Sequence, residues 1–194
     1  LKEIHEQPRA VGETVREKLA AGRIAFPELP ALPTDFDRVY LVACGTAYHA
    51  GLVAEYQWKE LLGVPVHSLI ASEFRYRAVP VGPRTLVVAV SQSGETVDTL
   101  MAVRRAKEGG ARVIGVLNTV GSAIEREADG VAYTRAGIEI GVAATKTFTA
   151  QLALLSLLGL RLACHCACRQ AQRHSHCRRV LHPLLLSCSA HGQV

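Results

Sequence analysis

The chain has 194 residues, of which 49% are hydrophobic and 20% charged, a composition typical of a soluble protein with room for one α/β domain. Its net charge of +5 does not indicate a nucleic-acid-binding protein, because residues 164–194 supply +4 through four arginines and contain no Asp, Glu or Lys. Residues 1–163 hold a net charge of only +1, which excludes a basic surface for a polyanion.

We expect neither a membrane-spanning segment nor a signal peptide. The longest strongly apolar stretch, residues 152–163, contains Arg161 and is shorter than the roughly 20 apolar residues of a membrane helix. The polar residues 1–4 lead into an amphipathic helix, unlike a secretory leader. Because Cys44 is the one cysteine before residue 164, this part of the chain fits a reducing cytoplasm. The chain does not begin with Met, so we expect an excised or processed segment.

The pattern along the chain predicts alternating strands and helices after an N-terminal helix at residues 4–22 and a proline-marked linker. Buried strands are expected at residues 38–43, 66–70, 85–90, 112–117 and 130–134. Helices are expected at residues 47–62, 97–107, 122–127 and 145–163, with a short helix or loop at 72–77. This alternation predicts an α/β fold, with a doubly wound parallel sheet of about five strands.

Residues 91–96, with the sequence Ser-Gln-Ser-Gly-Glu-Thr, lie where a predicted buried strand ends and a helix begins. Ligands bind at such positions in open α/β sheets, and hydroxyl groups beside the free N–H groups of a helix N-terminus suit an anion such as phosphate. The alternative is structural, with Thr96 capping the helix and Gly94 forming a turn. A second loop with a hydroxyl group, residues 44–47, follows another strand and favours a shared ligand-binding crevice.

Four further side chains could take part in chemistry, and each has a structural alternative. Cys44 is a possible nucleophile, but a small buried residue at a strand end is expected instead. His49 is expected to pack or to face solvent. Glu73 is a possible acid/base group, but an ion pair with the arginine two or four residues later is favoured. Lys146 could contact an anion or be an ordinary lysine on a helix surface.

Four stretches of the sequence resemble the SIS (sugar isomerase) fold. They are residues 44–51 (CGTAYHAG), 71–77 (ASEFRYR), 91–99 (SQSGETVDT) and 139–149 (EIGVAATKTFT). Within that fold, residues 2–163 resemble the first SIS subdomain of the glutamine–fructose-6-phosphate aminotransferase (isomerizing) family, because Ser-Glu-Phe-Arg-Tyr-Arg and Glu-Ile-Gly-Val-Ala are narrower motifs than the shared loop. The resemblance implies a flavodoxin-like sheet.

The resemblance also implies a binding site for fructose 6-phosphate or glucosamine 6-phosphate, without a metal or another cofactor. Its residues would be Thr46, Ala47, Ser91, Gln92, Ser93, Thr96, Val142 and Ala144. The hydroxyl groups and loop amides would contact the phosphate, and Val142 and Ala144 would approach the sugar. The family often has serine at the positions of Ala47 and Ala144, so two side-chain hydroxyl groups are absent here.

Members of the resembled family form glucosamine 6-phosphate with three further parts: a glutaminase domain, a second SIS subdomain and a C-terminal tail. The last two carry the acid/base glutamate, the Schiff-base lysine and the ring-opening histidine. None of these groups has a matching position here, so we expect no catalytic residue, and binding without catalysis. We also expect a homodimer formed through SIS packing, and neither nucleic acid nor a membrane as a partner.

Two alternative functions remain open at the level of sequence. One is a non-catalytic SIS sensor of phosphosugars, although residues 1–38 are too short and too rich in proline for a helix-turn-helix domain. The other is a stand-alone phosphosugar isomerase, which would need a glutamate and histidine pair completed by a dimer partner.

Three parts of the chain are expected: an N-terminal helix and linker at 1–35, the sugar-phosphate-binding domain at 36–163, and an atypical tail at 164–194. The tail holds five of the six cysteines and five of the eight histidines. This composition favours translation of another reading frame or an unrelated extension. A metal site is the alternative, but the spacing C-x-C-x-C differs from that of common structural zinc sites.

Overall fold

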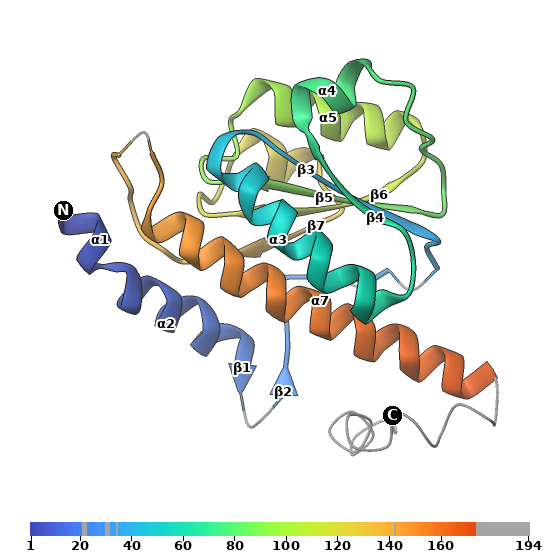
Figure 1. The fold of residues 1–194 in the computed structure, drawn as a ribbon, viewed down its shortest axis with the longest axis horizontal. Coiled ribbons are helices and arrows are strands. Elements are labelled where there is room, and N and C mark those ends of the chain that lie inside the picture. Colours follow the sequence, from blue (N-terminus) through green and yellow to red (C-terminus); the bar gives the residue numbers. More distant parts are fainter. Residues whose placement is uncertain (21–22, 30–31, 34, 142, 174–194) are drawn as a thin grey trace.

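The structure is a computed structural model that describes residues 1–20, 23–29, 32–33, 35–141 and 143–173. A parallel sheet lies at its centre, between two layers of helices (Figure 1). The five strands of this sheet are β3 (Arg38–Ala43), β4 (Val66–Ile70), β5 (Thr85–Ser91), β6 (Arg112–Leu117) and β7 (Gly130–Tyr133). All neighbouring pairs are parallel, in the order β4-β3-β5-β6-β7. This is the flavodoxin-like order, and it confirms the predicted doubly wound sheet.

Helices cover both faces of the sheet, which explains why the three central strands, β3, β5 and β6, are almost entirely apolar and buried. On one face, Leu41 and Val88 pack against α3 (Gly45–Leu62) and α7 (Lys146–Arg173). On the other face, Val42 and Ala89 belong to a second core. That core includes residues of α4 (Ala71–Tyr76), α5 (Val97–Glu108) and α6 (Ala123–Glu127).

Helix α7 is the main apolar element of the first core. Its segment Lys146–Cys166 is long and apolar enough to cross a membrane, by length and composition alone. In the structure, however, the side chains of Leu154, Leu155, Leu158 and Leu162 are fully buried in the same core as residues of the sheet and of α3. Their burial identifies α7 as a core helix of a folded domain.

The N-terminal segment differs from the single helix predicted at residues 4–22. It consists of α1 (Lys2–His5) and α2 (Gln7–Lys18), and α2 packs along α7 (Figure 1). The helix ends at Lys18 because the next residues form a strand, β1 (Leu19–Ala20), which pairs with the antiparallel β2 (Arg23–Ile24). The buried ammonium of Lys18 forms an ion pair with Glu28, which fixes this end of the helix.

The predicted end of the last helix at residue 163 is also wrong. Helix α7 continues to Arg173, and the sequence from 160 to 173 contains neither Gly nor Pro to stop it. The division of the chain at residues 35 and 163 stays a prediction, and so does the metal alternative for the tail. Residues 174–194, which contain Cys177 and Cys188, lie outside the described residues.

Candidate functional site

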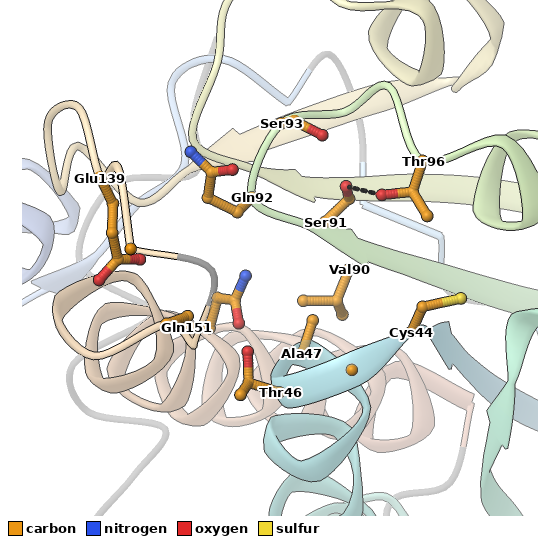
Figure 2. A pocket seen from close by; sticks show the side chains of 13 residues that line it. Cys44, Thr46, Ala47, Val90, Ser91, Gln92, Ser93, Thr96, Glu139 and Gln151 are labelled. Atoms are coloured by element: carbon orange, nitrogen blue, oxygen red, sulfur yellow. Dashed lines mark hydrogen bonds between the residues drawn. The ribbon is translucent and has the colours of Figure 1, made fainter.

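A pocket with a volume of about 230 Å³ lies at the carboxyl ends of β3 and β5 (Figure 2). These two strands are neighbours in the sheet, but the chain leaves them in opposite directions. Strand β3 leads into α3 on one face, and β5 leads into α5 on the other. The strand order reverses between them, which is where doubly wound sheets bind ligands. The topology therefore creates the crevice that the sequence predicts.

The loop after β5 is held in shape by its own hydroxyl groups. The buried Ser91 Oγ accepts a hydrogen bond from the Gly94 amide at 3.0 Å and lies 3.2 Å from Thr96 Oγ1 (Figure 2). Thr96 occupies the N-cap position of α5, but its side chain makes no capping hydrogen bond. The alternative role of Thr96 as a helix cap is therefore not seen. The first-turn N–H groups of α5 keep the partial positive charge that attracts anions.

Glycine is the only residue type that fits position 94 of this loop. Its φ of +67° lies in the left-handed region, and an added Cβ would lie 2.1 Å from Ser122 Oγ at the start of α6. The backbone of the loop consequently packs directly on α6. On its outer side, the Ala123 amide donates to Glu95 Oε1 at 2.8 Å. These contacts fix the position of the loop relative to the sheet.

The loop after β3 forms the other side of the pocket with Cys44, Gly45, Thr46 and Ala47. Cys44 is the N-cap residue of α3 and makes no side-chain capping bond. Two helices, α3 and α5, thus begin beside the pocket without a side-chain cap. The half-buried Cys44 Sγ has Thr99 Oγ1 as its hydrogen-bond partner at 3.9 Å, which fits a packed residue rather than an activated nucleophile.

A third helix, α7, also begins at the pocket, and there a carboxylate satisfies the N-terminal amides. Glu139 Oε1 accepts hydrogen bonds from the amides of Thr145 and Lys146 at 2.7 and 3.0 Å, and Glu139 Oε2 accepts one from the Thr147 hydroxyl. Burial acts to raise the pKa of Glu139, but these hydrogen bonds outweigh it and hold the pKa below its usual value. Glu139 is therefore an ionised structural cap.

The predicted site residues come together, apart from one that is not described. Thr46, Ala47, Ser91, Gln92, Ser93, Thr96 and Ala144 line the pocket, and Val142 lies outside the described residues. The pocket is also lined by four residues that were not predicted from the sequence as site residues: Val90, Glu139, Gly141 and Gln151. Gln151 could have been found from its spacing, because it precedes Leu154, Leu155 and Leu158 on the buried face of α7.

The other candidate side chains lie outside the pocket lining. His49 is exposed, as expected, and Glu73 forms the expected ion pair with Arg77 at 3.3 Å. Lys146 is neither a surface lysine nor part of the pocket, because its side chain is buried and its Nζ lies 2.6 Å from Glu6 Oε2. That hydrogen bond lowers the pKa of Glu6.

The described lining of the pocket is polar and mostly uncharged. Among the described lining residues there is no Lys or Arg, and Glu139 is the only charged side chain. No group of three or more His, Cys, Asp or Glu side chains within the described ranges is placed to hold a metal ion. An anion here would be bound by hydroxyl groups and by helix N-termini.

Comparisons with known proteins agree with this fold. The family model of the SIS domain matches residues 34–161. The glutamine–fructose-6-phosphate aminotransferase (isomerizing) of Mycobacterium tuberculosis (strain ATCC 25618 / H37Rv) is 55% identical over 166 residues, which cover 84% of this chain and 27% of that protein. The enzyme of the same name from Aquifex aeolicus (strain VF5) is 51% identical over 161 residues, covering 83% and 26%.

A solved structure is also similar, the C-terminal domain of glucosamine-fructose-6-phosphate aminotransferase from Francisella tularensis. The two share 42% sequence identity with a TM-score of 0.78, over 84% of this chain and 46% of that one. The chain spans about a quarter of the length of the curated relatives it matches. Because the family model matches well over half of the residues, this chain belongs to the SIS domain family.

Proposed function

We propose that this chain binds a hexose 6-phosphate, either fructose 6-phosphate or glucosamine 6-phosphate, in the pocket at the carboxyl ends of β3 and β5. The observation that carries the proposal is the pair of loops at the switch point, where two helices begin without side-chain caps. Their N-terminal amides, with the hydroxyl groups of Thr46, Ser91, Ser93 and Thr96, provide hydrogen-bond donors for the phosphate oxygens. The names of the similar enzymes support fructose 6-phosphate as the ligand.

We further propose that the chain forms the phosphosugar-binding half of the isomerase domain of a glutamine–fructose-6-phosphate aminotransferase. In that role it acts in the cytoplasm with a glutaminase domain and a second SIS subdomain, as a homodimer. By itself it binds without catalysing. Two lining side chains could exchange a proton, Cys44 and Glu139. The carboxylate of Glu139 is engaged by the start of α7, and the partner of the Cys44 thiol in the described part of the chain is the hydroxyl group of Thr99.

Calorimetric titration of the full chain tests the binding. Fructose 6-phosphate is expected to bind, whereas fructose without phosphate is not. The variant Ser91→Ala removes the hydroxyl that organises the loop and should weaken binding about tenfold. Ser156→Ala is the matched control, because its hydroxyl bonds to Gln57 and Leu152, away from the pocket. Equal affinity for fructose and fructose 6-phosphate would contradict the proposal.

An activity assay separates binding from catalysis. The purified chain is incubated with fructose 6-phosphate and either glutamine or ammonia, and glucosamine 6-phosphate is measured. No product above the reaction without protein is expected. Product formation would show that the chain contains catalytic groups that we have not identified, even if the titration confirms binding.

A further inference from the structure

Gln151 is a buried polar residue in the pocket that neither the fold nor the phosphate loops explain. It lies early in α7, is 2% exposed and lines the pocket. Its Oε1 atom is buried and has no hydrogen-bond partner within the described part of the chain. Figure 2 shows the side-chain amide pointing into the space that Thr46 and Ala47 border from α3.

An unpaired buried amide oxygen destabilises a folded protein, and such groups are rare in native structures. The next buried positions on this face of α7 are leucines, Leu154, Leu155 and Leu158. An apolar side chain at residue 151 would thus continue this pattern and would leave no buried polar atom unpaired. Glu139, the neighbouring polar side chain, already accepts bonds from Thr145 and Thr147 and does not explain the glutamine.

The chemistry of an amide indicates what Gln151 can bind. Its oxygen needs a hydrogen-bond donor, and its NH₂ group needs an acceptor. A fully ionised phosphate offers only acceptors, whereas a sugar hydroxyl group is both donor and acceptor. The hydroxyl-rich loop after β5 belongs to a different wall of the pocket from α7 (Figure 2). A ligand with its phosphate at that loop can therefore place a hydroxyl group at Gln151.

We propose that the side-chain amide of Gln151 binds a hydroxyl group of the sugar, and that this contact makes the pocket prefer a sugar phosphate over a simple phosphate ester. The inference rests on the proposed hexose 6-phosphate site and adds a residue that selects the sugar. Gln151 is a ligand-binding residue in this account, and its unpaired oxygen in the free protein is a consequence of that role.

The test combines the binding of two ligands with one measurement of stability, all in the full chain. Fructose 6-phosphate and methyl phosphate are titrated into the unmodified chain, into Gln151→Met, and into Gln57→Met. Gln57 is the matched control, because it is an exposed glutamine of α3 whose Oε1 accepts a bond from Ser156. The midpoint of thermal unfolding is measured for each free protein.

In Gln151→Met, the affinity for fructose 6-phosphate should fall about tenfold, while that for methyl phosphate changes less than twofold. The unfolding midpoint should stay the same or rise, because an unpaired polar atom is removed. Gln57→Met should change neither the ratio of affinities nor the midpoint.

Two results would overturn the inference. One is an unchanged ratio of affinities in Gln151→Met. The other is failure to fold by both Gln151→Met and a second variant, Gln151→Leu. Either would assign Gln151 a structural role. Failure of the unmodified chain to bind fructose 6-phosphate would instead refute the proposed function on which this inference rests. The two failures are therefore distinguishable.

Discussion

At the residue scale, the proposed phosphate site depends on backbone and hydroxyl donors that one glycine holds in place. Gly94 has a left-handed backbone and packs against Ser122. Substitution to Ala adds a strained conformation that costs about 1–2 kcal/mol, and a contact that α6 must move to relieve. Gly94→Ala should therefore lower the thermal midpoint by several degrees and weaken binding of fructose 6-phosphate.

The control for this substitution is Gly12→Ala in α2, where a Cβ meets no atom within 4 Å and the backbone is helical. It should leave binding unchanged and the midpoint equal or higher. If Gly94→Ala and Gly12→Ala have the same affinity for fructose 6-phosphate and the same thermal midpoint, the loop does not depend on the backbone conformation of Gly94.

Glu139 makes the stability of the folded chain depend on pH. The pKa of Glu139 is lower in the folded chain than its ordinary value of about 4.5, so its contribution to stability is present above that value and is lost as pH falls through the folded pKa. Glu139→Gln should reduce stability at neutral pH by about 1–3 kcal/mol and flatten the loss of stability at acid pH.

Chemical denaturation at several pH values between neutral and acid pH measures both effects. Glu108→Gln, at an exposed end of α5, removes the same charge without a helix cap. Parallel stability curves for the two variants would contradict the role given to Glu139.

The sequence predicts the polar residues that follow β3 and β5 because each lies within a few positions of a strand end. Glu139 and Gln151 are different, since Glu139 lies well beyond the end of β7 in the long connection to α7, and Gln151 lies within α7 itself. They reach the pocket because α7 crosses the sheet beside α3, a tertiary arrangement that local patterns do not encode. A glutamine on an apolar helix face was the available signal.

At the scale of elements, the position of α7 is set by a close approach to α3. Trp58 Nε1 donates to the Leu155 carbonyl at 3.1 Å, and a Cβ on Gly159 would lie 2.2 Å from that nitrogen. The glycine therefore allows the indole to lie directly on the backbone of α7. This contact holds the two helices together below the pocket.

Gly159→Ala should force α7 away from the indole and reduce the free energy of unfolding by about 1–3 kcal/mol. Because Trp58 is the only tryptophan, its fluorescence reports on this contact directly. We expect a changed emission spectrum in the folded variant together with a lower denaturation midpoint. An unchanged spectrum and midpoint would show that the helices do not pack as described.

The central strands were predictable because apolar runs rich in β-branched residues identify strands buried on both faces. The end of α2 and the end of α7 were not. The first is set by pairing of Leu19–Ala20 with Arg23–Ile24, which depends on residues beyond the helix. The second lies in a segment whose composition suggested a break, although its residues permit a helix.

At the scale of the molecule, the fold places two loops from adjacent strands at one edge of the sheet. A different cleft lies near the amino ends of β3 and β5 and is lined by Asp37, Arg38, Arg84 and residues 80–83. Both arginines of this cleft form ion pairs with Asp37, Arg38 at 3.0 Å and Arg84 at 3.3 Å. We therefore assign ligand binding to the pocket at the carboxyl ends of these strands, and not to the cleft with basic side chains.

Mapping the binding site by NMR tests this central claim most directly. Backbone amide shifts of the full chain are followed while fructose 6-phosphate is added. The account predicts that the largest changes fall in residues 44–47 and 91–97, at the carboxyl ends of β3 and β5. Changes centred on Arg38 and residues 80–85, or no saturable change anywhere, would contradict it.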